Sequence, residues 1–321
     1  MNDITRKYLD NFIADYESAK KICRWDGATS AATMAAVLIG NDLPTDFESI
    51  RKAQQVIKKN VGAFSGLRSG YARNIVTAAV AMSDDQESAI RTIAKIEADL
   101  KPGMFESFQW IICATMIYLN SESGDYKTVV DRTRMIYNDL AKNHPIIGGG
   151  KHVANCALLA MSDKDPYYIS EEYEECYKEL VKIYGRGSAT LYTAAAMSLF
   201  GGGADIKAEK VKMLHQTLKG MRFHFATEGL EIIALISGLF GDNPQDILRD
   251  MEEVSKELTK VKGMGAWGVG DKVRNMLAAT IVIDACTEDR KEACFAKQAI
   301  MNILCQTMSD NDSAAVVVAT M

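Results

Sequence analysis

Proline is scarce in this chain, with five residues among 321, whereas methionine occurs sixteen times and alanine is frequent. Because proline interrupts helices and alanine favours them, this balance favours helix over strand. Positive charge is also in short supply, since 37 lysines and arginines face 42 acidic residues and the net charge is −5. A general nucleic-acid binder needs a basic surface, so we expect no nucleic-acid partner.

Signals for secretion or membrane insertion are also lacking. The first residues, MNDITRKYLDNF, contain no apolar signal core, and the longest uncharged apolar run, near LAATIVI, is far too short to span a bilayer. The seven cysteines are odd in number and none stands in a CxxC pair. We therefore expect buried free thiols in a reducing compartment, and a soluble cytoplasmic protein without membrane contact.

Small apolar stretches recur along the chain at intervals of 37 to 44 residues. Their equivalent positions are Ile39, Met82, Leu119, Met161, Leu199, Leu239 and Ile283. Four residues earlier, one helical turn back on the same face, five of the seven positions hold alanine. An amphipathic stretch such as MIYNDLAK follows each of these segments. The pattern predicts an apolar inner helix followed by an amphipathic outer helix, in a unit of about forty residues.

This repeat predicts one all-α domain over residues 1–321. We expect a capping helix at 1–24, about seven helical hairpins at 25–308, and a partial helix at 309–321. Stacked hairpins cover the apolar inner helices on both sides, as in other helical-repeat proteins. We favour a right-handed α-α superhelix, that is a solenoid, over a closed ring of hairpins.

The connections between helices fall into two classes. Turns from inner to outer helices are acidic, whereas turns from outer to inner helices carry Lys, Arg or His followed by glycine or proline. This arrangement complements the helix dipole, which is a structural explanation, but it also creates a basic edge that could bind an acidic partner or an anion. The candidate binding residues on this edge are Lys101, Lys142, His144, Lys151, His152, Arg186, Lys219 and Arg222.

The turn HPIIGGGKH, at residues 144–152, superficially resembles a phosphate-binding loop. It lacks the first glycine and the Ser or Thr of a P-loop, and a helix precedes it where a strand is required. The turn ends one helix and begins the next, and the backbone N–H groups after Gly150 together with Lys151 could still hold an anion.

Other chemical motifs are absent from the sequence. We find no metal-ligand spacing, no G-x-S-x-G motif and no cofactor signature, so we expect no metal and no cofactor. Glutamates surround Cys176 and would raise its pKa, which makes it a poor nucleophile. His215 is expected to be half-buried on a helix, and the aromatic residues Trp25, Trp110, Trp267, Tyr118 and Tyr192 are expected to pack in the core.

Residues 133–186 contain the segments RMIYNDLAKNHPIIGGGKHVANCALLAM and YEECYKELVKIYG. This succession of an IY…L helix, an HP turn, an ALLA-like helix and a Y…L helix resembles the family known as domain of unknown function 4003. The resemblance implies a bacterial cytosolic protein and supplies no activity and no catalytic residue.

From these observations we predict a non-enzymatic helical-repeat scaffold that binds a protein or peptide partner through a groove or through the basic edge. The alternative is an enzyme, or a protein that binds a small molecule or an anion, which uses the interior of the superhelix or ring. The sequence leaves the identity of the partner and the oligomeric state open.

Overall fold

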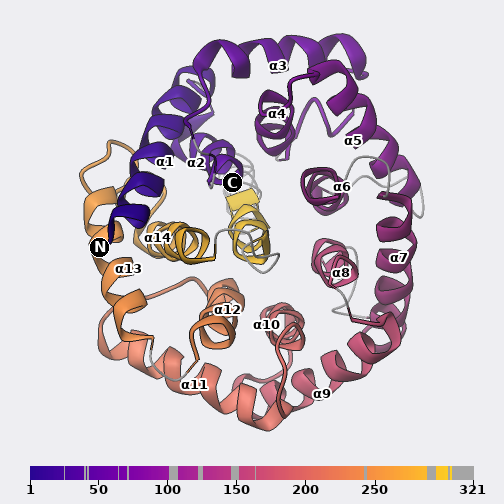
Figure 1. The fold of residues 1–321 in the computed structure, drawn as a ribbon, viewed down its shortest axis with the longest axis vertical. Helices are drawn as coiled ribbons and strands as arrows, with labels where there is room; N and C mark the ends of the chain where they lie inside the picture. The colour runs from indigo at the N-terminus through magenta and orange to yellow at the C-terminus, as the bar shows by residue number, and fades with distance from the viewer. Residues whose placement is uncertain are drawn as a thin grey trace, which may run out of the picture.

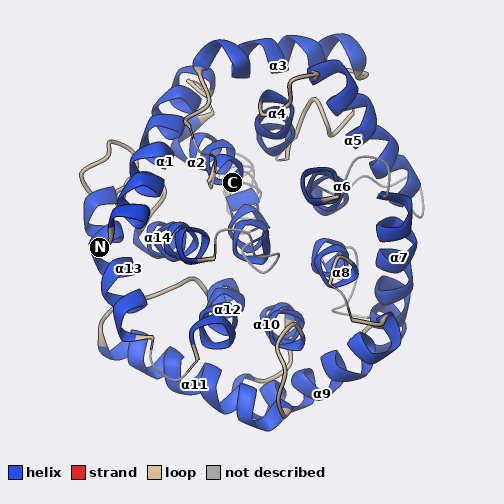
Figure 2. Ribbon diagram, viewed as in Figure 1, coloured by secondary structure: helices blue, strands red, loops and turns tan. Residues whose placement is uncertain are grey.

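The computed structural model describes residues 1–24, 26–39, 41, 43–63, 65–70, 72–100, 108–121, 126–145, 152–162, 164–241, 244–287, 294–302 and 304–305. Within these ranges all regular secondary structure is helical, which confirms the predicted all-α class (Figure 2). None of the helices in these ranges is long and apolar enough to cross a membrane.

The helices form two concentric layers of a ring (Figure 1). Outer helices run around the circumference and are seen lengthwise, whereas inner helices stand along the ring axis and are seen end-on. The outer layer consists of α1 (Asp3–Ile22), α3 (Phe47–Asn60), α5 (Gln86–Leu100), α7 (Tyr126–Asn143), α9 (Pro166–Tyr184), α11 (Ala204–Gly220) and α13 (Gln245–Leu258). The inner layer consists of α2 (Gly27–Leu38), α4 (Arg73–Ala81), α6 (Phe108–Asn120), α8 (Val153–Ala160), α10 (Ser188–Ser198), α12 (Leu230–Phe240) and α14 (Asp271–Cys286), with a short 3₁₀ turn η2 (Thr227–Gly229) before α12.

Burial explains why the two layers differ. The inner helices are covered on all sides, so that every residue from Val153 to Ala160 is buried, and their many alanines let neighbouring helices approach closely. The outer helices bury one stripe only. In α5 this stripe follows the helical spacing through Ile90, Ile93, Ile96 and Leu100.

The ring is closed, because the first helix lies beside the last hairpin. Helix α1 packs against both α2 and α14 (Figure 1). The side-chain amide of Asn2 donates to Asp250 of α13 at 3.3 Å, and the Tyr16 hydroxyl donates to the carbonyl of Lys262 at 3.3 Å. The structure therefore corrects our preference for an open superhelix. The N-terminal segment is a full member of the outer layer, since it covers the flank of α14 that an open end would expose.

A second correction concerns the last predicted hairpin. Its second helix, which we call the central helix (residues 294–302 and 304–305), was expected on the outside but lies inside the ring (Figure 1). Phe295, Ala299, Ile300 and Leu304 are all buried there. The outer position next to α13 is already occupied by α1, and a helix so widely apolar is best buried inside the inner layer. The predicted partial helix at 309–321 lies outside the described residues.

Basic side chains secure the C-terminal ends of two inner helices. Arg132 donates to the carbonyl of Ser162 at 3.0 Å, just after α8, and Lys164 donates to the carbonyl of Ser198 at 2.6 Å, at the end of α10. Lys207 binds the carbonyls of Met197 and Phe200 at 3.2 and 3.1 Å. These donors satisfy carbonyls that have no partner within their own helix.

Candidate functional site

Successive hairpins run in the same direction, so the turns from outer to inner helices lie on one face of the ring, which we call the basic face. Four of the predicted binding residues are exposed in or next to these turns, namely Lys142, Arg186, Lys219 and Arg222. Lys101 and Lys151 lie outside the described residues, as does most of the turn HPIIGGGKH.

His144 faces the protein itself. Its Nε2 atom lies 2.8 Å from Oε1 of Glu174, and its ring packs edge-on against Tyr177 with 4.6 Å between ring centres. Both partners belong to α9, so His144 ties the end of α7 to the next outer helix. We therefore assign it a structural contact.

His152 is buried in the interior, next to the first turn of α8. Its ring lies 4.4 Å from that of Tyr192 on α10. One turn later on α8, Asn155 donates its side-chain amide to Oε1 of Glu231 on α12 at 2.6 Å. Within the inner layer, α10 separates α8 from α12. Asn155 and Glu231 therefore meet on the side of this layer that faces the ring axis.

The central helix completes this interior polar cluster. Gln298 donates its side-chain amide to Oδ1 of Asn155 at 3.3 Å, so Glu231, Asn155 and Gln298 form one buried chain of hydrogen bonds. Burial raises the pKa of Glu231 to about 8, although the hydrogen bond from Asn155 acts in the opposite direction. At neutral pH this carboxyl is therefore mainly protonated and uncharged.

Trp267 contradicts the expectation that it packs in the core, because its side chain is fully exposed. Trp110, in contrast, is buried as predicted and packs against Tyr137. Tyr118 and Tyr192 are half-buried, and Trp25 lies outside the described residues. Trp267 belongs to the turn between α13 and α14, which places it on the basic face.

The turn that carries Trp267 is held by its own hydrogen bonds. Val269 N donates to the carbonyl of Gly263 at 2.9 Å, and Gly268 N and Gly270 N both donate to the carbonyl of Gly265, at 3.0 and 3.1 Å. Gly263 has a φ of +100°, which favours glycine. The buried side chain of Met264 and the contact of Tyr16 with Lys262 fix the turn to the ring. Trp267 is thus an exposed side chain on a turn whose backbone is ordered.

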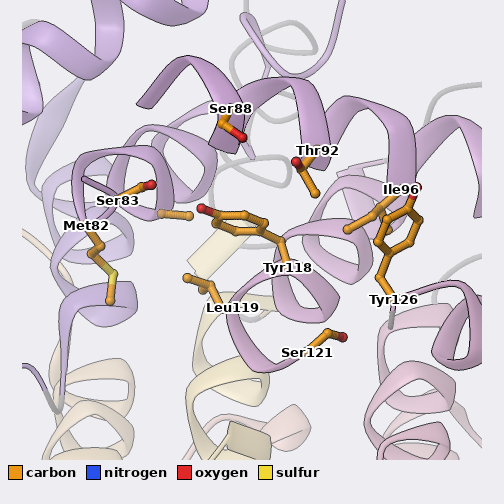
Figure 3. Close-up of a pocket in the computed structure, with 10 residues that line it drawn as sticks. Met82, Ser83, Ser88, Thr92, Ile96, Tyr118, Leu119, Ser121 and Tyr126 are labelled. Atoms are coloured by element: carbon orange, nitrogen blue, oxygen red, sulfur yellow. The ribbon is translucent and has the colours of Figure 1, made fainter. Parts of the chain in front are cut away.

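A cavity of about 570 Å³ opens on the opposite face of the ring (Figure 3). It lies between the C-terminal ends of the inner helices α4 and α6, the outer helix α5, and the start of α7. The residues that line it are Ala79, Met82, Ser83, Ser88, Thr92, Ile96, Tyr118, Leu119, Ser121 and Tyr126. Sequence reasoning missed this cavity, because its hydroxyl groups are spread over α5, α6, α7 and the turns that follow α4 and α6.

A family model described as "Protein of unknown function (DUF4003)" matches residues 15–314. The chain belongs to the DUF4003 family. The resemblance seen in residues 133–186 is thereby confirmed and extends over nearly the whole ring. No curated protein and no solved structure matches the chain.

Nucleophilic chemistry is poorly supported in this DUF4003 protein. Burial raises the pKa of the Cys176 thiol to about 11, and Glu172 adds to the rise, while Lys207 opposes it. The other cysteines are also free: Cys23, Cys113, Cys156 and Cys305 are buried, Cys294 is half-buried and Cys286 is exposed. His215 is half-buried as expected, with its Nδ1 atom 3.3 Å from the Tyr184 hydroxyl. In the described part of the chain, no three His, Cys, Asp or Glu side chains gather as metal ligands would.

Proposed function

We propose that the protein is a scaffold whose basic face binds an acidic segment of a partner protein, with Trp267 as the anchor. The exposure of Trp267 on an ordered turn carries this proposal. An exposed tryptophan presents a large apolar surface to water, and tryptophan is enriched among the residues that dominate binding energies at protein interfaces. A turn that is already ordered loses little conformational entropy on binding.

Charge around Trp267 supports an acidic partner. Lys262 and Lys272 stand five residues before and after it, and both are exposed. Arg222, at the neighbouring turn, is exposed as well. The N-terminal ends of α10 and α12 lie on the same face without a capping side chain, so their dipoles add positive potential there. At α14 the first turn carries Asp271, which offsets the dipole and pairs with Arg274.

The alternative is an enzyme or a small-molecule binder that uses the ring interior, and it would rest on Glu231, Asn155 and Gln298. These side chains are buried against one another, and the central helix lies over them. The two hydrogen bonds among them help to hold that helix inside the ring, although Oε1 of Gln298 has no partner among the described residues. We therefore prefer binding at the basic face.

The test places a photo-crosslinking amino acid at position 267 and, as a control, at position 168. Tyr168 is a matched control, because it is an exposed aromatic residue on α9, away from this turn. The partner crosslinked through position 267 in an extract of the native cells is identified, and the peptide that carries the crosslink is synthesised. We expect this peptide to be acidic.

The affinity of the peptide is then measured for the wild type and three variants. Trp267→Ala should weaken binding by about 30-fold, which corresponds to about 2 kcal/mol. Lys262→Glu should weaken it in a salt-dependent manner, and Tyr168→Ala should leave it unchanged. Identical crosslinked proteins at positions 267 and 168, or full affinity in Trp267→Ala, would rule out the proposal.

A further inference from the structure

The cavity between α4, α5, α6 and α7 has a lining of distinctive chemistry. Hydroxyl groups come from α5, α6, α7 and the turns after α4 and α6, and the described residues of the lining include no charged side chain. The hydroxyl-bearing residues are Ser83, Ser88, Thr92, Tyr118, Ser121 and Tyr126. Each hydroxyl can donate one hydrogen bond and accept others, so together they match a ligand that itself carries several hydroxyl groups.

Figure 3 shows how these groups are arranged. The Tyr118 ring extends across the cavity, with Ser83 beyond its hydroxyl and with Ser88 and Thr92 on α5 above it. Ser83 donates to the carbonyl of Asp85 at 3.1 Å, which leaves its oxygen free to accept. The hydroxyl of Ser121 is buried and has no hydrogen-bond partner within the described residues. A buried hydroxyl without a partner is unfavourable, and a bound ligand would provide one.

Apolar groups complete the cavity wall. Ala79, Met82, Ile96 and Leu119 share the lining with the hydroxyl groups and with the Tyr118 ring. A sugar has the same mixed character, because its ring has C–H faces and a rim of hydroxyl groups. The volume of about 570 Å³ falls within the usual range of small-molecule sites and suits a mono- or disaccharide.

The charged side chains at the rim of the cavity indicate whether it favours a neutral or an anionic ligand. Ser88 and Thr92 also line a second, shallower depression of about 370 Å³, together with Asp85, Glu87, Arg91 and Lys95. Glu87 is paired with Lys59 at 3.0 Å and with Arg91 at 2.9 Å. Among the described residues at the rim, two acidic and two basic side chains therefore balance, so these residues provide no excess positive charge that would select for a phosphate group.

We infer that this cavity binds a neutral, polyhydroxylated molecule of mono- or disaccharide size. Its C–H face packs on the Tyr118 ring, Met82 and Leu119, while the hydroxyl groups of Ser83, Ser88, Thr92, Tyr118 and Ser121 exchange hydrogen bonds with its own hydroxyl groups. The site lies on the face opposite Trp267, so this inference does not depend on the partner proposed for the basic face.

The test uses the full-length protein with glucose, ribose, sucrose and trehalose as neutral probes and glucose 6-phosphate as the anionic comparator. Binding is measured by saturation-transfer NMR and by calorimetry. We expect at least one neutral sugar to bind with one-to-one stoichiometry and more tightly than glucose 6-phosphate. Thr92→Val and Tyr118→Phe each remove one hydroxyl and should weaken binding by about tenfold.

Control variants keep the interpretation clear. Thr217→Val removes an exposed hydroxyl on α11 and should bind the sugar as the wild type does. Trp267→Ala should also bind it normally. Ser88→Ala serves as the second cavity variant if Thr92→Val melts at a lower temperature than the wild type. The inference is overturned if none of the neutral sugars binds, if the cavity variants keep full affinity, or if only glucose 6-phosphate binds.

Discussion

Glu231 is the residue at which burial and charge conflict most strongly. Its side chain is almost completely enclosed, and burial raises its pKa from 4.5 to about 8. Asp15 is a second case, since burial raises its pKa to about 7 while its Oδ1 atom accepts a hydrogen bond from Thr45 N at 2.7 Å. Each carboxyl thus keeps a proton in the folded protein at a pH where the unfolded chain has already lost it.

This conflict predicts how stability depends on pH. Between pH 4.5 and about 8 the folded state binds one more proton at Glu231 than the unfolded state, so the free energy of unfolding falls as the pH rises through this window. Glu231→Gln removes the titration. The wild type should therefore lose more stability than the variant between pH 5 and pH 8.5, by up to roughly 4 kcal/mol. Urea unfolding at both pH values measures the difference.

A suitable control for this experiment is Glu175→Gln, which changes an exposed carboxyl on α9. It should show the pH dependence of the wild type. A residual slope is expected in Glu231→Gln, because Asp15 still titrates. Equal slopes in the wild type and Glu231→Gln would mean that Glu231 is ionised in the folded protein.

At the scale of single elements, the central helix is the segment whose position the sequence pattern misplaced. Leu304 is completely buried there. Leu304→Ala should therefore reduce the free energy of unfolding by about 2–5 kcal/mol, as is usual when a buried leucine is truncated. Ile206→Ala, at an exposed position on α11, is the control and should change stability by less than about 0.5 kcal/mol. An equally small effect of Leu304→Ala would place this helix outside the ring.

The turn that carries Trp267 offers a second test within one element. A Cβ atom at position 268 would overlap the carbonyl of Gly263, whereas one at position 265 would meet no atom. Gly268→Ala should therefore disrupt the turn and speed hydrogen exchange at the Val269 amide, which donates to Gly263. It should also weaken partner binding although Trp267 is retained. Gly265→Ala should preserve both properties, and rapid exchange in that variant would contradict an ordered turn.

Most of the helices could be predicted from the sequence, because apolar spacing reports directly on which residues a helix buries. The stretch VANCALLA is apolar apart from Asn155 and forms an inner helix, and MIYNDLAK is apolar on one side and lies in the outer layer. Which element covers an apolar face depends on tertiary contacts, and the apolar spacing within one helix does not report these. The repeat predicts an outer helix for the segment from Phe295 to Leu304, yet this segment is enclosed, because α1 already occupies the outer position beside α13 (Figure 1).

The candidate sites were harder to predict for the same reason. His144 and Arg186 belong to the turns that the charge pattern identified, but only the structure shows that Glu174 engages His144. Tyr118 and Ser83 lie 35 residues apart, and they share a cavity only after the hairpins are stacked. Trp267 is flanked by Ala266 and Gly268, and this local sequence resembles a buried segment as much as an exposed turn.

At the scale of the whole molecule, closure gives the ring two distinct faces, each of which continues around the ring. Inner helices point their N-terminal ends to the face with Trp267 and their C-terminal ends to the face with the hydroxyl-lined cavity. The same topology that aligns basic turns on one side therefore separates the two proposed sites. A protein partner and a small ligand can bind at the same time without competing for surface.

Closure also predicts how the ring unfolds. In an open solenoid the terminal repeats have one neighbour and open first, whereas α1 here contacts both α2 and α14. Amides in α1 should therefore exchange hydrogen as slowly as those in α7, midway along the chain. Phe12 is buried on α1, so Phe12→Ala should speed exchange in α7 as well as in α14, because it destabilises one cooperative unit. Native-state hydrogen exchange followed by mass spectrometry measures all three helices together. Fast exchange of α1 in the wild type, with α7 still protected, would instead indicate an open chain of independently opening hairpins.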